Sequence, residues 1–250
     1  ENAERVLRMQ KELGIRFGEA ALRLGLISEA DIQQVLARQF DYPYLQEGEG
    51  KFSSELFADT AIDFLRNHRG QEPFFLYVAF TAPHDPRTPP EQYARLYDPQ
   101  TIPLPKNFLP EHPFDNGELR IRDELLAPFP RTPEVIRKHI ADYYAMITHL
   151  DSQIGHILET LEETGHADDT IVLFSSDNGL AVGRHGLMGK QNLYEHSTRM
   201  PLIVAGPGLP RGRSEALVYL YDLLPTIGEL AGLTVPAGVE GKSLVPIVRG

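Results

Sequence analysis

Two adjacent oxygen-bearing side chains, Asp177 and Asn178, follow the apolar run at residues 170–174 (TIVLF). Such a run predicts a buried strand, and sites in open α/β sheets form just past the carboxyl ends of strands. A carboxylate beside an amide carbonyl suits a hard divalent cation such as Ca²⁺ or Mg²⁺. The following Gly179 allows the backbone to turn sharply. The alternative is an Asx-type turn that only ends the strand, and the pattern leaves both explanations open.

A histidine between two prolines is the second candidate for chemistry. His84 follows residues 74–80 (FFLYVAF), a continuous apolar run that predicts a strand buried on both faces. At that position His84 can contact an anionic substrate or protonate a leaving group. The other explanation is a surface loop histidine. Its neighbour Asp85 could orient the ring, although a solvated turn residue explains Asp85 equally simply.

A glycine-rich segment, residues 183–190 (GRHGLMGK), supplies further cationic groups. Its glycines permit close approach of the backbone to a ligand, and His185 and Lys190 are candidates to bind an oxyanion. Lys190 could equally be a solvated charge. Arg199 precedes the third predicted strand, and a structural salt bridge is the simpler explanation for it. Several of these loops follow buried strands, which favours one combined site for an anion and a metal.

The elements that must position these residues alternate between helix and strand from residue 51 onward. Thr132, Pro133 and Glu134 predict the start of a long helix, because they supply a cap, a proline at the first position and an early acid. Gly165 predicts its end. Strands are predicted at 74–80, 170–174 and 202–205, with helices from Ser53 or Ser54 to Leu65, around Tyr93 and Tyr97, and at 221–230. The order predicts an α/β sheet with crossover helices. The long loop region at residues 81–131 suggests that it carries function.

The first 46 residues read as a separate small helical segment. Gly25 predicts the end of one helix, and Ser28 predicts the cap of a second helix that carries Ile32, Val35, Leu36 and Phe40 on one face. Residues 46–51 (QEGEGK) predict a linker. The expected domains are therefore residues 1–46 and residues 51–250.

Composition excludes several classes of function. The 250 residues carry a formal net charge of −11, which argues against binding of a nucleic-acid backbone. No stretch approaches the roughly eighteen consecutive apolar residues of a membrane span. Cysteine is absent, which excludes disulfides, thiolate metal sites and a cysteine nucleophile within this chain. The chain begins at Glu1 without a basic-then-apolar leader, so we expect no targeting signal in it and infer no compartment.

Residues 50–250 resemble the formylglycine-dependent sulfatases of the alkaline-phosphatase superfamily. The resemblance is carried by ordered motifs, which are FFLYVAFTAPHDP, LDSQIGHILETLEETGHADDTIVLFSSDNG, GRHGLMGKQNLYEHSTRMPLIVAGPG and YDLLPTIGELAG. It implies a partial alkaline-phosphatase-like sheet flanked by helices, and hydrolysis of a sulfate ester of a carbohydrate or an aryl alcohol. It also implies that Asp177 and Asn178 are calcium ligands and that His84 and Lys190 contact the sulfate and assist the leaving oxygen. A substrate-binding role for His185 is implied less directly. Relatives are often periplasmic, secreted or lysosomal.

The chain departs from this family at the nucleophile. The family makes formylglycine from the Cys or Ser of a C/S-x-P-x-R motif, and the 250 residues contain no Cys and no Ser followed by x-P-x-R. The family's early Asp-Asp metal pair is also missing. We therefore expect residues 51–250 to be the carboxyl-side part of a truncated sulfatase domain, with negligible turnover by itself. The alternatives are a phosphate or phosphonate ester hydrolase of the same superfamily, and a fusion that acts only by binding.

Residues 14–45 resemble a different protein class, the amino-terminal helical module of type II secretion ATPases and of some exopolysaccharide tyrosine kinases. In some relatives two tandem copies of a motif bind cyclic dinucleotides, and because one copy is present here we do not expect nucleotide binding. A generic helical bundle would explain the same segment. Two unrelated resemblances that meet at residues 48–50 suggest the hypothesis of a fused or rearranged reading frame.

Overall fold

The computed structural model describes residues 2–14, 17–28, 53–70 and 72–249, which form two compact units divided between Ser53 and Ser54. In the first unit, α1 (Asn2–Leu13) and α2 (Phe17–Arg23) pack around the buried side chains of Val6, Ala20 and Ala21. The second predicted helix and the predicted linker at 46–51 lie outside the described residues. The domain boundaries at 46 and 51 stay a prediction. Among the described residues, no helix is both long enough and apolar enough to cross a bilayer.

Gly25 ends the helical part of the first unit as predicted. Its φ is +64°, its N–H donates to Leu22 O at 2.8 Å, and Leu26 N donates to Ala21 O at 3.0 Å. These two bonds form a Schellman motif, which satisfies carbonyl groups that the last helical turn leaves unpaired.

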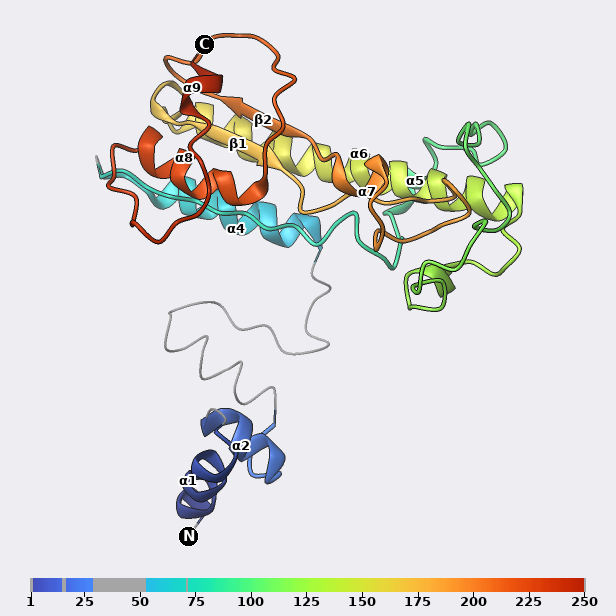
Figure 1. The fold of residues 1–250 in the computed structure, drawn as a ribbon. Helices are drawn as coiled ribbons and strands as arrows, with labels where there is room; N and C mark the ends of the chain where they lie inside the picture. The colour runs from blue at the N-terminus through green and yellow to red at the C-terminus, as the bar shows by residue number, and fades with distance from the viewer. Residues whose placement is uncertain (1, 15–16, 29–52, 71, 250) are drawn as a thin grey trace. The chain divides into compact units, whose positions relative to one another are not determined.

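The second unit is organised along one long helix, α6 (Pro133–Glu163). The Thr132 hydroxyl accepts a hydrogen bond from Val135 N at 3.4 Å, and Pro133 occupies the first turn. Gly165, with a φ of +79°, follows the helix end. Figure 1 shows β1, β2 and α8 around the C-terminal half of α6, and the loops of residues 82–131 around its N-terminal half. The predicted start and end of this helix are both confirmed.

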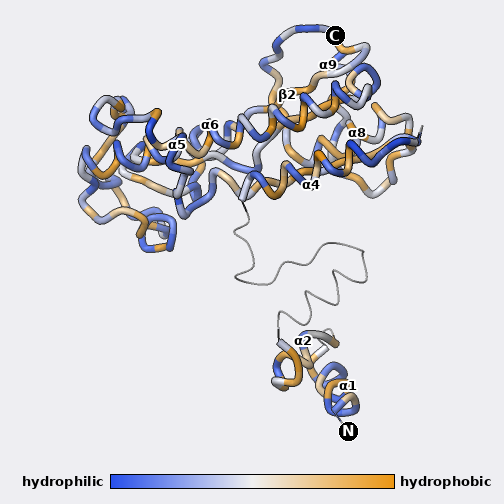
Figure 2. The backbone as a smooth tube through the Cα atoms, turned by 180° about the vertical axis from the view of Figure 1, so that it is seen from behind, coloured by the Kyte–Doolittle hydropathy of each residue, from blue (hydrophilic) through white to orange (hydrophobic). Residues whose placement is uncertain are grey.

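Helix α4 (Ser54–Asn67) runs beside the C-terminal half of α6. Its first turn places Glu55 Oε1 2.7 Å from His149 Nε2, and its last turn places Arg66 3.8 Å from Glu163. Hydrophobic and hydrophilic residues alternate along both helices in Figure 2, as expected of amphipathic helices that bury one face. The short helix α5 (Glu91–Ala94) contains Tyr93, whose ring lies 4.9 Å from that of His149. Tyr97 lies beyond that helix.

Two short strands form the sheet within the described residues, and they are antiparallel, so the predicted arrangement of strands joined by crossover helices is wrong. β1 (Val172–Ser175) pairs with β2 (Leu202–Ala205), so that Val172 lies opposite Ala205 and Ser175 opposite Leu202. The segment that joins them, residues 176–201, contains most of the predicted site residues. After β2, η3 (Leu220–Asp222), α8 (Leu223–Leu230) and α9 (Val245–Val248) complete the unit. The 3₁₀ turns η1 (Glu124–Leu126) and η2 (Ala167–Asp169) flank α6.

The α/β fold class is confirmed, but the prediction of a buried strand at residues 74–80 is wrong. The segment is not a strand, and alternate side chains project outward, with Phe75 71% and Tyr77 80% exposed. The other side chains face α4, where the rings of Phe74 and Phe64 lie 5.7 Å apart. A strand requires a hydrogen-bonded neighbour, which an apolar run cannot supply by itself. The two observed strands are likewise only partly buried.

The main core lies where the N-terminal half of α6 meets the loops. Its members are buried apolar side chains of α6, of the loops before it and of the segment between the strands, namely Ile102, Ala127, Ile136, Ile140, Ala141, Val182 and Met188. Val182 and Met188 belong to the segment that carries Lys190. The packing of the core therefore also fixes the position of the candidate site.

Candidate anion-binding site

A hairpin lies in the segment between β1 and β2, and four of the predicted site residues lie in it or next to it. Ala181 N donates to Gly189 O at 3.0 Å, and Gly183 N donates to Leu187 O at 2.7 Å, so two arms of the backbone run side by side. Asp177 and Asn178 precede the first arm and Lys190 follows the second. Lys190 therefore lies at the open end of this hairpin, which spans residues 181–189, and Asp177 and Asn178 lie in the loop that leads into the hairpin from β1. His185 occupies its closed end.

The loop of Asp177 and Asn178 is fixed against the segment that returns to β2. Gly179 N donates to Ser197 O at 3.0 Å, and a Cβ at Gly179 would stand 1.9 Å from His196 O. Only glycine therefore fits at this position. The Ser197 hydroxyl donates to Asn192 Oδ1 at 3.0 Å, which connects the loop to the residues just after Lys190.

Lys190 and His84 are in direct contact. Lys190 Nζ lies 3.2 Å from His84 Nε2, although the two residues are 106 positions apart. His84 Nδ1 lies 2.9 Å from the backbone oxygen of Asp85. Because a carbonyl can only accept, Nδ1 carries the proton and Nε2 accepts from the ammonium group. The predicted partnership of His84 with Asp85 is thus present, mainly through the backbone of Asp85.

Two further carboxylates and an arginine close a ring of charges around this contact. Asp123 Oδ2 lies 3.6 Å from Lys190 Nζ, and Arg122 donates to Asp123 Oδ1 at 3.1 Å. Arg122 also binds Asp85, at 3.0 Å and 3.1 Å. Burial would raise the pKa of Asp123, but hydrogen bonds from Gln191 and Arg122 outweigh burial and lower it. Asp123 is therefore ionised at neutral pH.

Asp123 and its neighbour Glu124 are site residues that the sequence did not single out. The only signal was the length of the loop region at 81–131, which suggested a function without indicating a residue. Glu124 is 3% exposed, and its carboxylate accepts hydrogen bonds from the N–H groups of Met188 and Gly189 at 2.9 Å and 2.8 Å. A sequence pattern cannot show such a contact, because the partners are 64 and 65 positions away.

His185 contacts a different set of residues from Lys190. Asn107 Nδ2 lies 2.8 Å from His185 Nε2, and the Tyr194 ring stacks on the imidazole at 4.0 Å. His185 has a φ of +55°, and its backbone N–H donates to Asn107 O at 2.8 Å. The structure therefore places His185 at the closed end of the hairpin, against residue 107. Its predicted contact with substrate stays a prediction.

The neighbouring His196 is neutral under ordinary conditions. Burial, with the nearby Arg184 and His185, lowers the pKa of His196 from 6.5 to about 4. Its Nε2 is buried without a hydrogen-bond partner. Arg199, at the end of α7 (Glu195–Thr198), forms an exposed ion pair with Glu195 at 3.5 Å, which agrees with the structural salt bridge expected for it.

Asp177 and Asn178 offer suitable oxygens for a hard cation, but few of them. Asp177 Oδ1 accepts from Asn178 N at 2.9 Å, and Asn178 Nδ2 donates to Gly179 O at 3.1 Å. The amide nitrogen of Asn178 therefore binds the backbone oxygen of Gly179. Across the described ranges, no cluster of three or more His, Asp or Glu side chains is arranged to hold a metal ion. The donors thus fit Ca²⁺ in kind, although Ca²⁺ takes six to eight oxygens.

Comparison with known proteins identifies the family. The family model described as Sulfatase matches residues 26–233. The chain is 32% identical over 221 residues to a choline-sulfatase of Rhizobium meliloti (strain 1021), covering 81% of this chain and 43% of that protein. It is 35% identical over 196 residues to an arylsulfatase of Clostridium perfringens (strain 13 / Type A), covering 76% and 40%.

A solved structure supports the same fold. A phosphonate monoester hydrolase from Silicibacter pomeroyi matches with a TM-score of 0.66 and 27% identity, over 88% of this chain and 50% of that chain. The chain thus spans between two fifths and one half of the length of these proteins. The matched range also includes part of the segment at 14–45 that resembles the secretion ATPases, a resemblance that stays a prediction. With its α/β fold and a family match over most of its length, the chain belongs to the sulfatase family.

Proposed function

We propose that this chain supplies the anion-binding side of a site that hydrolyses sulfate esters. The contact between Lys190 Nζ and His84 Nε2 carries the proposal, because it joins two nitrogen-bearing side chains from distant loops at one point. Membership of the sulfatase family and the similarity to a choline-sulfatase and an arylsulfatase support it. The substrate class is a sulfate ester of a carbohydrate, an aryl alcohol or a similar small alcohol.

Lys190 is the main ligand for the anion in this proposal. The side chain of Lys190 is 21% exposed, and its ammonium group has three N–H donors, of which one is directed at His84. The remaining donors can bind sulfate oxygens and stabilise the negative charge that builds up as the ester bond breaks. His84, 46% exposed, can accept a proton at Nε2 from Lys190 or from an incoming group.

A divalent cation, typically calcium, is a feature of the family, and Asp177 and Asn178 are the residues that would contact it. Such a cation would neutralise charge on the sulfate oxygens. Two side chains form only part of a calcium site, so no step of the reaction is assigned to the ion here. Formylglycine has no precursor in these 250 residues, because they contain no Cys and no Ser-x-Pro-x-Arg.

Binding of inorganic sulfate tests the anion site directly. Isothermal titration of the whole chain should show sulfate binding that weakens by a factor of about 10 to 150 in Lys190→Met, since a hydrogen bond to a charged group contributes about 1.5–3 kcal/mol. Lys106→Met, which removes the same charge from an exposed loop, is the matched control and should bind as the wild type does. Equal sulfate affinity in the wild type and Lys190→Met would contradict the proposal.

Turnover tests the argument about the nucleophile. We expect the 250-residue chain to release no measurable 4-nitrophenol from 4-nitrophenyl sulfate, with or without millimolar calcium, because covalent catalysis has no nucleophile in these residues. Robust turnover that is lost in Lys190→Met would show that the chemistry proceeds by another route.

Phosphonate ester hydrolysis is the second candidate, and one observation favours it. The Silicibacter pomeroyi hydrolase with the TM-score of 0.66 acts on phosphonate monoesters by name. Phenyl sulfate and the phenyl ester of phenylphosphonate are both singly charged, so a titration with each compares the two tetrahedral anions at equal charge. Phosphonate affinity about tenfold above that for phenyl sulfate would replace the first proposal with the second.

A further inference from the structure

A buried ion pair contacts the backbone of the hairpin arm that leads to Lys190. The side chains of Arg131 and Glu124 are 0% and 4% exposed, and Arg131 Nη2 lies 2.7 Å from Glu124 Oε2. Arg131 also donates to the backbone oxygens of Ala127 and Gly186. A buried ion pair is costly to desolvate and is weak evidence for a stabilising role by itself. The other hydrogen bonds of Glu124, which go to the backbone of the hairpin, indicate the role of this ion pair.

Both oxygens of Glu124 bind the hairpin just before Lys190. Oε2 accepts from Met188 N at 2.9 Å as well as from Arg131, and Oε1 accepts from Gly189 N at 2.8 Å. At Gly189 a Cβ would stand 2.7 Å from Gln191 Oε1 and 2.9 Å from Asp123 Cβ. The absence of a side chain thus lets the backbone lie against the Asp123–Glu124 turn.

The adjacent Asp123 contacts the ammonium group at the end of the Lys190 side chain. Its Oδ2 lies 3.6 Å from Lys190 Nζ and accepts from Gln191 Nε2 at 3.0 Å. Two consecutive acidic residues therefore constrain the backbone before Lys190, the side chain after it, and its ammonium group. Each type of restraint reduces the freedom of a long, flexible side chain.

We propose that Asp123 and Glu124 are positioning residues that direct the Lys190 ammonium at the anion site, Glu124 through the backbone and Asp123 through the charge. Neither residue acts on the substrate directly. The role of Lys190 rests on the proposed function, whereas the restraint on Lys190 is a property of the fold that can be measured separately.

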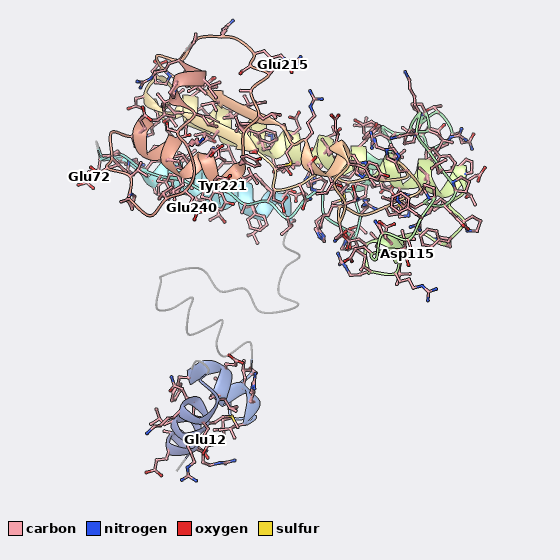
Figure 3. All side chains as sticks on the ribbon, in the orientation of Figure 1. Glu12, Glu72, Asp115, Glu215, Tyr221 and Glu240 are labelled. Atoms are coloured by element: carbon pink, nitrogen blue, oxygen red, sulfur yellow. The ribbon has the colours of Figure 1, made fainter. Side chains whose placement is uncertain are left out.

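Asp222 provides a matched comparison for Glu124. Its buried carboxylate also accepts from two backbone N–H groups, those of Tyr219 at 2.9 Å and Lys242 at 2.8 Å. Figure 3 labels the adjacent Tyr221 near the C-terminal half of α6, and Asp115 among the loops at its other end. Glu124→Gln and Asp222→Asn therefore remove similar restraints, but only the first lies beside Lys190.

The first measurement is the NMR signal of the Lys190 ammonium in protein labelled with ¹⁵N-lysine. A restrained, hydrogen-bonded ammonium exchanges its protons slowly with water. The chain has six lysines, and Lys138, which pairs with Asp142 on α6, serves as the internal reference. We expect exchange at Lys190 to accelerate about tenfold in Glu124→Gln and in Asp123→Asn, and to be unchanged in Asp222→Asn. Unchanged exchange in both site variants would overturn the proposal.

The second measurement covers the case in which Glu124→Gln does not fold. In the wild type, the amide protons of Met188 and Gly189 should exchange as slowly as those of α6, because Glu124 binds them in the interior. Exchange at the rate of an exposed loop would overturn the role of Glu124, and Asp123→Asn would still test that of Asp123.

Sulfate titration then separates this proposal from the proposed function. If the wild type binds sulfate, Glu124→Gln should weaken binding about fivefold. If the wild type does not bind sulfate but the ammonium signal responds as expected, the positioning role stands and the proposed function fails. Sulfate binding that is equally tight in Glu124→Gln and the wild type would overturn the positioning role.

Discussion

The two ends of the second unit are stabilised in different ways. Around the N-terminal half of α6, the hairpin packs into the core through Val182 and Met188. Its backbone is also hydrogen-bonded by Glu124, which pairs with Arg131. At the other end, the sheet has only two strands of four residues, and Phe174 and Ile203 remain 38% and 57% exposed. Two-stranded sheets are marginal by themselves. The site end therefore depends on specific polar contacts, whereas the sheet end depends on the helices beside it.

The comparison indicates where a substitution is costly. The buried pair of Arg131 and Glu124 lies at the hairpin, and Glu124 also binds two backbone N–H groups there, so changes at this pair remove several interactions together. Beyond β2, Gly208 has no neighbour within 4 Å of a Cβ built on it, whereas Gly186 at the hairpin does.

Arg131→Met should have the largest effect. It leaves the buried Glu124 carboxylate without its counter-charge, and removal of one partner of a buried ion pair costs about 3–5 kcal/mol of the free energy of unfolding. Chemical denaturation at pH 7 measures the loss. Arg213→Met, which breaks the exposed pair with Glu215, is the control and should change the unfolding free energy by less than about 1 kcal/mol. Similar values for the two variants would show that the buried pair has no special role.

Gly186→Ala and Gly208→Ala form a pair with nearly equal φ, +77° and +73°, at the two ends of the unit. A Cβ at Gly186 would stand 2.4 Å from Glu111 C, whereas a Cβ at Gly208 meets nothing within 4 Å. We expect Gly208→Ala to cost about 1 kcal/mol for the positive φ alone, and Gly186→Ala about 2–4 kcal/mol because crowding adds to it. Thermal and chemical unfolding measure both. Equal losses of unfolding free energy in the two variants would mean that the backbone at Glu111 moves away from the added Cβ at little cost.

His196→Phe should change the pH dependence of stability. The folded pKa of His196, about 4, lies below the unfolded value of 6.5, so the unfolded chain binds the proton more readily. The contribution of His196 to the free energy of unfolding is fully present above pH 6.5 and is lost as the pH falls toward 4. After allowance for partial exposure, the loss is about 1–2 kcal/mol. Denaturation between pH 7 and pH 4.5 should show a shallower decline in His196→Phe, and parallel curves would refute the prediction.

The parts of the fold that depend on local interactions were predictable from the sequence. Thr132, Pro133 and Gly165 fix the ends of α6 through caps and backbone conformation, which involve only neighbouring residues. The apolar runs at 170–174 and 202–205 correspond to β1 and β2. The run at 74–80 looked similar but is not a strand, because strand formation depends on a partner elsewhere in the chain.

The sequence by itself determined which residue types were available for binding an anion, and the family motifs that carry His84, Lys190, Asp177 and Asn178. Only the tertiary structure decided that Lys190 meets His84, that His185 lies at the other end of the hairpin, and that Asp123 contacts Lys190 while Glu124 binds the backbone just before it. The physical reason is distance along the chain. Caps and turns are set by residues within a few positions, whereas these contacts join residues tens of positions apart and exist only once the core around α6 has formed.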